Sequence, residues 1–382
     1  MLEGEKYQVT IVGGGPAGST AAAYLSDYGF SVCLIEKKVF PRETLCGEFL
    51  SKEVTAILDE LDIKDHLFSL GANPVTSIRF VNQNGGMLVS PLGFIGYGLK
   101  RGAFDQLLLE NAVKKGAAVI QPAEVKNISK ENEKNYRLII LNKNGQPCSI
   151  RTNIVIGAYG KKNFLDKELN REQADSVSRF NGIKFHFPLN IAPKFPLNEI
   201  QIYTAEGIYC GLNAVNDRIL TVCFLEDRNC FKGSSRDHLR LLMEKNISFK
   251  ELFLPEVSKI IECAPIYGTG NIFFGRKDLS VNGVIMIGDA ARVIAPLAGD
   301  GIAMAMQSGK LIADIVSKNF TSPAQKMEKL YKVKWNAEFS KRIFAARLIQ
   351  SVIMNKKLNQ IALNIGRIFP ALLNFLVRST RE

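Results

Sequence analysis

A glycine-rich turn between a strand and a helix, close to the N-terminus, constrains the fold of this chain more than any other feature. Residues 9–12 are an uncharged, mostly β-branched run, as expected for a buried parallel strand. Gly13, Gly15 and Gly18 follow with the spacing G-x-G-x-x-G. The helix predicted next, Ala17–Tyr28, would point its free amide groups at a phosphate. The turn therefore predicts an α/β domain that binds a dinucleotide.

The three glycines and a later acid have the positions that a bound diphosphate and ribose require. Gly13 permits the tight turn, Gly15 lets a pyrophosphate lie against the backbone, and Gly18 lets the helix pack closely on the sheet. A second buried strand over 31–35 ends at Glu36, where a carboxylate would accept hydrogen bonds from a ribose. These features alone do not separate FAD from NAD.

Length and composition place the chain among ordinary globular proteins. Its 382 residues suffice for two domains or one large elaborated domain. The first residues are polar and no apolar run reaches the ~18 residues that span a bilayer, so we expect neither a signal peptide nor a transmembrane helix. The 7 cysteines are scattered without a C-x-x-C pair, which favours a reducing, cytoplasmic location. The 3 histidines lie far apart, so no metal site is expected.

The net charge of +12 favours acidic partners. Nucleic acid is not expected, because no basic stripe with interleaved aromatic residues is present. Residues 341–382 are predicted helical, kinked or restarted at Pro370, and they carry Lys and Arg with Glu382 as the single acid. One apolar face is formed by Ile361, Ile365, Ile368, Leu372 and Phe375. The segment either contacts a membrane surface peripherally or packs on its own domain with a solvated basic face.

The hydrophobic pattern divides the chain into a discontinuous nucleotide domain and an inserted sheet. Alternation around Asn84-Gly85-Gly86 predicts a hairpin over 75–89, and strand-like runs dominate from 166 to 280, with helices only at 234–246 and 249–253. The nucleotide domain is assigned residues 1–74, 100–165 and 275–322. The substrate sheet is assigned residues 75–99 and 166–274, and a C-terminal helical segment is assigned residues 323–382.

A second glycine-rich turn follows a predicted strand far along the chain. Residues 283–287 predict a buried strand, and Asp289 follows it directly. A loop then leads through Gly299 and Gly301 into a helix of small residues over 302–317. The order of strand, acid, glycine-rich loop and helix N-terminus predicts a second anion-binding turn.

Three separated motifs together resemble the FAD-dependent oxidoreductases of the aromatic-hydroxylase superfamily. The motifs are Gly13-x-Gly15-x-x-Gly18 with Glu36, Arg101-x-x-Phe104-Asp105, and Gly288-Asp289-Ala-Ala-x-x-x-x-Pro296-x-x-Gly299-x-Gly301. The loop 41–47 and the run 296–309 are most similar to the geranylgeranyl reductase branch. The resemblance implies a Rossmann-like FAD-binding domain of the glutathione reductase type, with an inserted antiparallel substrate sheet and C-terminal helices.

The resemblance also implies which residues hold FAD. The turn Gly13–Gly18, with Pro16 and Ala17, would hold the pyrophosphate, and Glu36 the adenosine ribose. Arg101 would lie near the phosphate and ribityl chain, and Asp289 near the ribityl or pyrophosphate region. Backbone amides of Gly299–Ile302 would stabilise negative charge on the reduced ring. The other residues expected at the cofactor are Lys37, Arg42, Cys46, Gly47, Val125, Gly160, Pro296, Gly301 and Ile302.

Cys46 is the one residue proposed to act in catalysis. The resemblance places Cys46-Gly47 near the face of the flavin ring, where the thiol would be a proton source. The alternative is a small buried hydrophobic residue with no chemical role.

The chain departs from the family pattern at several points. Tyr159-Gly160 stands where the family has Asp-Gly, and the stretch Tyr209–Asn213 replaces a W-x-F-P-like segment that accompanies polyprenyl substrates. The W-x-W-x-I-P signature of flavin halogenases is missing, and the single tryptophan is Trp335. A second G-x-G-x-x-G is also missing, so NAD(P)H would bind transiently.

The leading interpretation is an FAD-dependent oxidoreductase that uses NAD(P)H to reduce a carbon–carbon double bond of a hydrophobic substrate, an isoprenoid or polyketide-like lipid. The alternative is a monooxygenase that hydroxylates an aromatic or quinol-like hydrophobic substrate. A third hypothesis is a flavin-binding electron-transfer protein without turnover. The substrate, the 2′-phosphate preference of the donor and the oligomeric state are left open.

Overall fold

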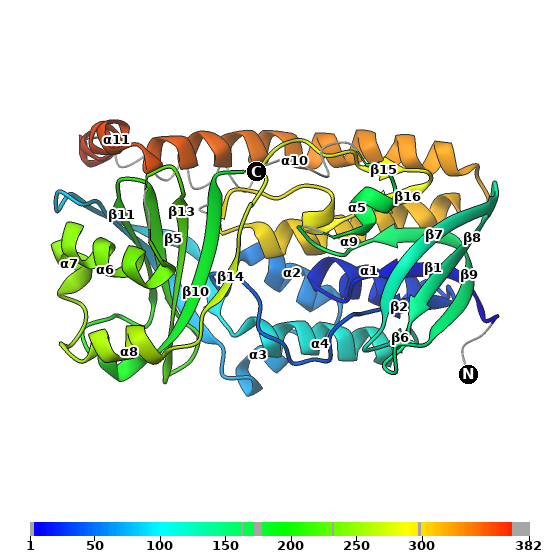
Figure 1. Ribbon diagram of the computed structural model, residues 1–382, viewed down its shortest axis with the longest axis horizontal. Coiled ribbons are helices and arrows are strands. Elements are labelled where there is room, and N and C mark those ends of the chain that lie inside the picture. Colours follow the sequence, from blue (N-terminus) through cyan, green and yellow to red (C-terminus); the bar gives the residue numbers. More distant parts are fainter. Residues whose placement is uncertain (1–3, 162, 172–177, 231–232, 297–298, 369–382) are drawn as a thin grey trace.

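Two eight-stranded sheets organise the part of the chain that the structure describes. The computed structural model describes residues 4–161, 163–171, 178–230, 233–296 and 299–368. In Figure 1 the first sheet lies on the right, the second sheet lies on the left, and one long helix runs above both. The expected α/β class with a second, mostly antiparallel sheet is confirmed.

The first sheet is built on parallel strands whose carboxyl ends coincide. Val12 is in register with Ile35 of one neighbouring strand and Gly157 of the other, and Gly157 pairs with Met286 of the next strand. The segments that follow these strands therefore leave from one edge of the sheet. The strands are β1 (Lys6–Val12), β2 (Val32–Ile35), β6 (Ala118–Ile120), β7 (Glu124–Asn132), β8 (Asn135–Leu141), β9 (Pro147–Gly157), β15 (Ser280–Val281) and β16 (Val284–Met286).

Helices cover this sheet and position the glycine-rich turns. α1 packs on both α4 and α9, and its residues Ala21, Ala22 and Ala23 are fully buried because alanine allows helices to approach closely. The helices on this half are α1 (Pro16–Asp27), α2 (Lys52–Glu60), α3 (His66–Ser69), α4 (Arg101–Lys114), α5 (Leu165–Glu168), the short turn η2 (Gly288–Ala290) and α9 (Gly301–Asn319).

The second sheet receives strands from three separate parts of the chain. The predicted hairpin over 75–89 is confirmed and is longer than expected. Phe49–Leu50 lies within the range assigned to the nucleotide domain, yet it pairs with this sheet. The strands are β3 (Phe49–Leu50), β4 (Asn73–Val81), β5 (Met87–Gly98), β10 (Phe180–Pro188), β11 (Glu199–Ala205), β12 (Ile208–Ala214), β13 (Ile219–Asp227) and β14 (Tyr267–Thr269).

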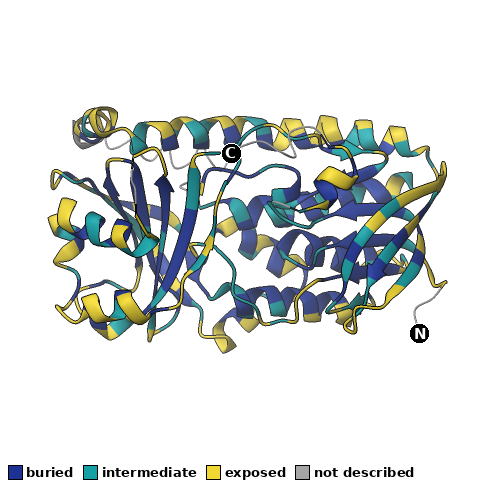
Figure 2. Ribbon diagram, viewed as in Figure 1, coloured by how far each residue is buried: buried dark blue, intermediate teal, exposed yellow. Residues whose placement is uncertain are grey.

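Short helices cover the outer face of the second sheet and leave its other face for the first half of the molecule (Figure 2). They are η1 (Leu189–Ile191), α6 (Ser235–Lys245), α7 (Ile247–Lys250) and α8 (Val257–Cys263). The helix expected at 249–253 is wrong in its bounds, because the Asn246 side chain accepts a hydrogen bond from the Phe249 amide and starts α7 earlier. α8 was not predicted.

The C-terminal segment is helical where the structure describes it. α10 (Ala324–Met354) packs on α9 of one half and on β11 and β12 of the other, and α11 (Lys356–Ile368) follows. Pro370, Leu372 and Phe375 lie outside the described residues. Ile361 and Ile365, two of the five residues of the expected apolar face, are 54% and 41% exposed, and the side chain of Ile368 is not described. Among the described helices, none combines the length and apolar character that a membrane crossing requires.

Candidate active site

The two glycine-rich turns, far apart in the sequence, lie side by side in the structure. A methyl group added at Gly309 would lie 2.5 Å from the Ala17 carbonyl oxygen, and one at Gly288 would lie 2.8 Å from the Ala17 methyl group. The missing side chains therefore let α1 and α9 approach closely. Both helices begin at the edge where the parallel strands end, so the turns around 13–18 and 288–301 face one site.

The first turns of both helices present amide groups that no described residue accepts. At α1 these are the amides of Gly15, Ala17 and Gly18, and the first turn contains no acidic side chain. At α9 the amides of Gly301 and Ile302 are likewise without an acceptor among the described residues. A buried N–H group needs an acceptor, so these donors fit the phosphates and the ring of a flavin dinucleotide.

The predicted ribose acid stands beside the first turn. Glu36 is 6% exposed, and its Oε2 accepts a hydrogen bond from the Gly14 amide at 2.7 Å. The carboxylate is thereby held at the carboxyl end of β2, with further acceptor positions for ribose hydroxyls. Val125 lies on β7, which begins beside Glu36 because the Ala123 amide donates to the Glu36 carbonyl. Lys37 points to solvent and pairs with Glu124 at 2.7 Å.

Arg42 and Arg101 meet at a shared carboxylate. Arg101 makes a bidentate contact with Asp105, with distances of 2.9 and 3.1 Å, and the Arg42 guanidinium lies 3.7 Å from the same buried side chain. Arg42 also faces Gly15, where an added methyl group would lie 3.7 Å from its Nη2. The cluster therefore brings the predicted arginines to the edge of the dinucleotide turn.

Cys46 lies between this cluster and the second sheet. Its Sγ accepts a hydrogen bond from the Glu48 amide at 3.2 Å, and Arg101 also contacts the sulfur. Gly47 is exposed, and its carbonyl accepts a hydrogen bond from Asn213 of β12. The loop that carries Cys46 thus spans the boundary between the two sheets.

The residues expected on the ribityl side are only partly gathered. Asp289 is one-third exposed and lies 3.9 Å from Lys161 Nζ, directly after Gly160. Gly299 has a positive φ of 65°, a conformation that favours glycine. Pro296 is exposed at the start of this loop, and residues 297–298 lie outside the described residues.

Tyr159, which replaces the family aspartate, reaches a nearby acid instead. Its hydroxyl donates to Asp166 Oδ1 at 2.9 Å. Asp166 is 3% exposed and also pairs with Arg171 at 2.9 Å and Lys277 at 3.3 Å. Burial and the Asp166 charge hold the pKa of Tyr159 above its usual range. A carboxylate is therefore present behind residues 159–160, although it comes from another segment.

A buried charge cluster lies immediately beyond Cys46, and the sequence did not predict it. Glu48 is 0% exposed and accepts hydrogen bonds from Lys184 Nζ at 2.9 Å and Thr221 Oγ1 at 2.5 Å. The Nε2 atom of His186 lies 2.6 Å from Glu48 Oε2, the oxygen that also accepts from Thr221, and Lys184 donates to Glu43 as well, at 2.7 Å. The cluster joins the Cys46 loop to β10 and β13.

The protonation states in this cluster follow from its geometry. Burial opposes ionisation of Glu48, but the hydrogen bond to His186 and the charge of Lys184 lower its pKa to about 2. Burial likewise opposes the charge of Lys184, and the two glutamates raise its pKa above its ordinary value. The pair is therefore ionised at neutral pH.

The same cluster has ligand atoms for a metal, but the ammonium group of Lys184 already lies between the two carboxylates. Glu43, Glu48 and His186 offer atoms that lie within 4.8 Å of one another. The ammonium of Lys184 bonds both carboxylates, so a divalent ion would have to displace a buried lysine. Lys184 and His186 lie two residues apart on β10, a spacing that places both side chains on one face of the strand. This spacing is the sequence feature that could have indicated the cluster.

An apolar cluster covers the face of the second sheet that points toward the Cys46 loop. Tyr209, which begins the departing stretch 209–213, is 6% exposed and packs with Ile202 and Leu225. Partly buried side chains at the end of α10 contribute Ile353 and Met354 to the same cluster. This face of the second sheet is therefore apolar although the family aromatic motif is missing.

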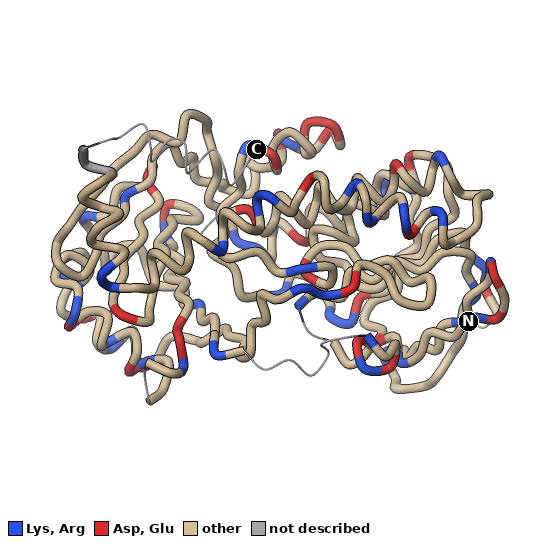
Figure 3. Tube along the Cα trace, turned by 90° about the horizontal axis from the view of Figure 1, so that it is seen from above, with Lys and Arg blue, Asp and Glu red and all other residues tan. Residues whose placement is uncertain are grey.

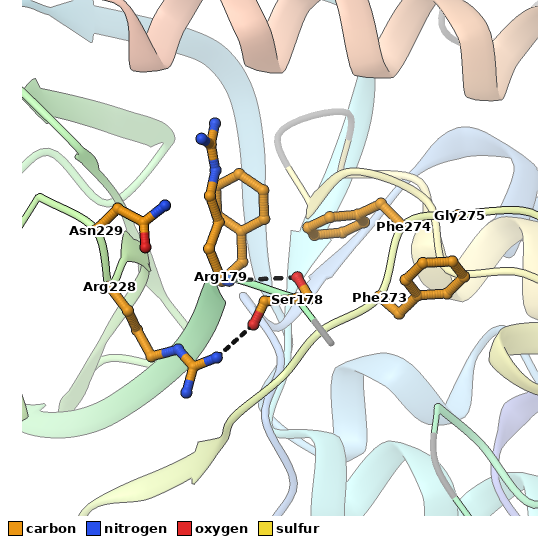
Figure 4. Close-up of a pocket in the computed structure, with 8 residues that line it drawn as sticks. Ser178, Arg179, Arg228, Asn229, Phe273, Phe274 and Gly275 are labelled. Atoms are coloured by element: carbon orange, nitrogen blue, oxygen red, sulfur yellow. Dashed lines mark hydrogen bonds between the residues drawn. The ribbon is translucent and has the colours of Figure 1, made fainter. Parts of the chain in front are cut away.

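A pocket of about 580 Å³ lies beside this cluster, because Phe180 and Phe274 belong to both. Figure 4 shows residues that line it. Three phenylalanine rings, from Phe180, Phe273 and Phe274, line it together with Arg179 and Arg228. Arg179 pairs with Asp227 at 3.0 Å, and Arg228 donates to the Ser178 carbonyl at 2.5 Å. The pocket combines aromatic walls with a cationic mouth.

Comparison with known proteins agrees with this geometry. The model of the FAD binding domain family matches residues 6–325. A digeranylgeranylglycerophospholipid reductase of Methanosarcina acetivorans is 26% identical, covering 92% of this chain and 86% of its own. A 1H-pyrrole-2-carbonyl-[peptidyl-carrier protein] chlorinase of Pseudomonas fluorescens is 24% identical, covering 81% and 76%. The solved structure of a geranylgeranyl bacteriochlorophyll reductase-like protein from Thermoplasma acidophilum aligns with a TM-score of 0.77 at 24% identity, covering 93% and 90%.

Proposed function

The chain belongs to the FAD binding domain family, and on that premise we propose that it is an FAD-dependent enzyme that reduces a carbon–carbon double bond of an isoprenoid lipid. The observation that carries the proposal is the apolar cluster of Ile202, Tyr209 and Leu225, which faces the Cys46 loop. Such a surface suits a hydrocarbon chain rather than a polar aromatic ring. The relative named as a phospholipid reductase, aligned over most of both chains, supports the same substrate class.

The residues of this chain divide the work of binding and protonation. Bound FAD, once reduced by NAD(P)H, supplies hydride chemistry. The amides at the starts of α1 and α9 hold its anionic parts, and Glu36 holds the ribose. Cys46 lies where its thiol can donate the proton that completes saturation of the double bond, and the buried Glu48–Lys184 pair fixes the loop that carries it.

Hydroxylation by molecular oxygen is the second candidate, because the same FAD site would serve a monooxygenase. Halogenation is disfavoured by position, since Trp335 is buried on α10 against Phe339. Reduction under strict exclusion of oxygen separates the two candidates. The FAD-loaded enzyme, NADPH or NADH, and a polyunsaturated isoprenoid lipid should yield a product heavier by two hydrogens per bond. Product formation only with oxygen, coupled to oxygen consumption, would overturn the reductase proposal.

We further propose that the enzyme works at a membrane surface through α10 and α11. Along the outer side of α10, Phe344 and Leu348 are 71% and 56% exposed, and Ile361 and Ile365 continue the exposed apolar surface on α11. Figure 3 views the side on which α10 lies. Between Glu338 and Glu382 the sequence contains no acidic residue. Exposed isoleucine, leucine and phenylalanine beside uncompensated lysines suit an anionic bilayer.

The docking of α11 agrees with an outward apolar face. Asn359 donates to Thr204 Oγ1 at 3.0 Å, and Gln360 accepts from Asn82 at 2.9 Å. α11 is therefore held on the second sheet by polar contacts, with Leu363 as its buried apolar residue among those whose side chains are described. Ile353 and Met354, at the end of α10, pack against the apolar cluster of Ile202, Tyr209 and Leu225. The exposed apolar side of α10 and α11 is therefore continuous with the helix end that reaches the proposed substrate site.

A further inference from the structure

The segments that carry Arg276, Arg292 and Arg347 pack together, since Phe274, Val293 and Ile353 belong to one apolar cluster. Arg276 follows the loop after β14, Arg292 follows η2, and Arg347 lies on α10. Burial and the charges of Arg347 and Arg276 lower the pKa of Arg292, and burial and Arg276 lower that of Arg347. Among the described residues no acid forms an ion pair with any of the three. We refer to them as the arginine trio.

Buried N–H groups of Arg292 and Arg347 have no acceptor among the described residues. Arg292 Nε and both Nε and Nη2 of Arg347 are buried without a hydrogen-bond partner. Arg292 is fixed by stacking over Trp335, with its guanidinium carbon 5.4 Å from the ring centre. Arg292 and Arg347 are partly buried and Arg276 is exposed. Buried N–H groups without an acceptor cost free energy, and the repulsion among three neighbouring positive charges adds to that cost. This arrangement is explained if an anion from outside the chain completes the site.

The geometry of the trio selects the chemical class of that anion. Guanidinium groups present parallel donors that match phosphate oxygens, and several arginines around one ligand favour a group with more than one negative charge. A single carboxylate would leave donors unsatisfied. A phosphate monoester, phosphodiester or diphosphate is therefore the fitting class.

The position of the trio relates this anion to the substrate. Arg276 directly follows Gly275, which lines the pocket with the three phenylalanine rings. In Figure 4 a helix with the colour of α10, which carries Arg347, crosses above this pocket. A lipid with its phosphate at the trio would place its first isoprene units among the rings and its chain toward the apolar cluster.

We infer that Arg276, Arg292 and Arg347 form a binding site for the phosphate or diphosphate head group of the lipid substrate. The identity of the ligand as substrate depends on the proposed reductase function, whereas the anion site itself does not. The same phosphate chemistry is present in NADPH and in FAD, so the test separates these sources.

The first measurement uses inorganic diphosphate and the full-length, FAD-loaded protein in isothermal titration calorimetry. Arg276→Gln and Arg347→Gln should each weaken diphosphate binding by about tenfold or more, since a charge-assisted hydrogen bond is lost. Lys334→Gln removes one charge from an exposed position of α10 and should leave binding within about twofold. Equal affinities in all four proteins, or binding that depends equally on Lys334, would overturn the site.

Thermal unfolding separates a binding role from a structural one. Without added anion the three guanidinium groups repel one another. The Arg347→Gln variant should therefore unfold at the same temperature as the wild type or at a higher one. Saturating diphosphate should raise the wild-type melting temperature by several degrees and that of the variant by less. A variant that melts lower without anion and responds normally to it would show a structural arginine and overturn the proposal.

Steady-state kinetics identify the source of the phosphate. For an isoprenoid diphosphate or phospholipid the variants should raise KM about tenfold or more with little change in kcat. The corresponding neutral isoprenoid alcohol, the KM for NADPH and the FAD content should be unchanged. A change confined to NADPH or to FAD content would overturn the head-group assignment. If no lipid is reduced by any of the proteins, the proposed function fails while the calorimetric result still stands.

Discussion

At the scale of single residues, two glycines of the first turn have different roles: Gly18 is needed for folding, and Gly15 is needed for cofactor binding. A methyl group at Gly18 would lie 1.9 Å from the Gly13 carbonyl oxygen, whereas one at Gly15 would meet only the flexible end of Arg42 at 3.7 Å. Gly15→Val should therefore give folded protein that retains less than about a tenth of its FAD, because the diphosphate cannot approach. Gly18→Ala should lower the melting temperature itself. Flavin absorbance measures the bound FAD and calorimetry measures the melting temperature. Full flavin retention by Gly15→Val would contradict the assignment of the turn Gly13–Gly18 to the pyrophosphate.

Glu48 makes a second residue-scale prediction. Glu48→Gln leaves the buried Lys184 with Glu43 as its one carboxylate partner among the described residues, and weakening this buried ion pair should cost about 3 kcal/mol, the low end for breaking such a pair. Urea unfolding at pH 7 should show this loss, whereas Glu338→Gln, at an exposed position of α10, should be within about 0.5 kcal/mol of the wild type. A loss below about 1 kcal/mol would mean that the pair contributes no more than a surface contact.

The lowered pKa of Glu48 gives the direction of its pH dependence. Its pKa is about 2 in the folded protein against an ordinary 4.5, so its contribution to stability is complete above pH 4.5. The contribution is lost as the pH falls from 4.5 through 2. Unfolding midpoints measured across this interval should fall more steeply for the wild type than for Glu48→Gln. Parallel curves would show that the carboxylate is not stabilised by Lys184 and His186.

Cys46 tests the proposed proton donor. Cys46→Ala should keep its FAD, because the thiol makes no contact that holds α1 or α9, and should lower kcat by about 10²-fold or more. Cys46→Ser, which retains a hydroxyl proton, should recover part of the rate. Wild-type turnover by the alanine variant would show that Cys46 is a packing residue.

At the scale of helices and strands, hydrophobic pattern predicted the elements that are buried on one or both sides. β1, β2 and the antiparallel strands of the second sheet follow uncharged or alternating runs. β7 was missed because its run Lys126–Asn132 is polar, and its strand character comes from pairing with β8. The trio and the Glu48 cluster were missed for a related reason. Their members lie on separate segments that only tertiary contacts bring together, 136 residues apart for Glu48 and Lys184, which spacing along one sequence does not reveal.

The outward face of α10 and α11 carries the element-scale prediction. The wild type should float with phosphatidylglycerol vesicles and not with phosphatidylcholine vesicles, and added salt should release it. The double variant Phe344→Ser and Leu348→Ser should bind about tenfold more weakly. Ile247→Ser, at a residue of α7 that is 67% exposed, is the matched control and should bind like the wild type. Equal flotation of all three proteins would remove the membrane proposal.

At the scale of the whole molecule, the chain crosses between the two sheets several times before α10 spans both. The order of strands shows this, since β3–β5 interrupt the first sheet and β10–β14 interrupt it again before β15 and β16. The two halves also share the Glu48 cluster. We expect one cooperative transition in calorimetry of the FAD-loaded enzyme, with equal calorimetric and van't Hoff enthalpies. Two resolved transitions would show that the halves unfold independently.

The repeated crossing also bears on how the protein is made. The proposed FAD site needs Gly13–Gly18 from one end of the chain and Gly299–Ile302 from near the other. During synthesis on the ribosome the turn Gly13–Gly18 emerges long before Gly299–Ile302. Strand β1 likewise emerges long before β9 and β16, which lie on one side of it in the sheet. The FAD site of the nascent chain is therefore incomplete until translation is nearly finished, and the coenzyme binds late in maturation.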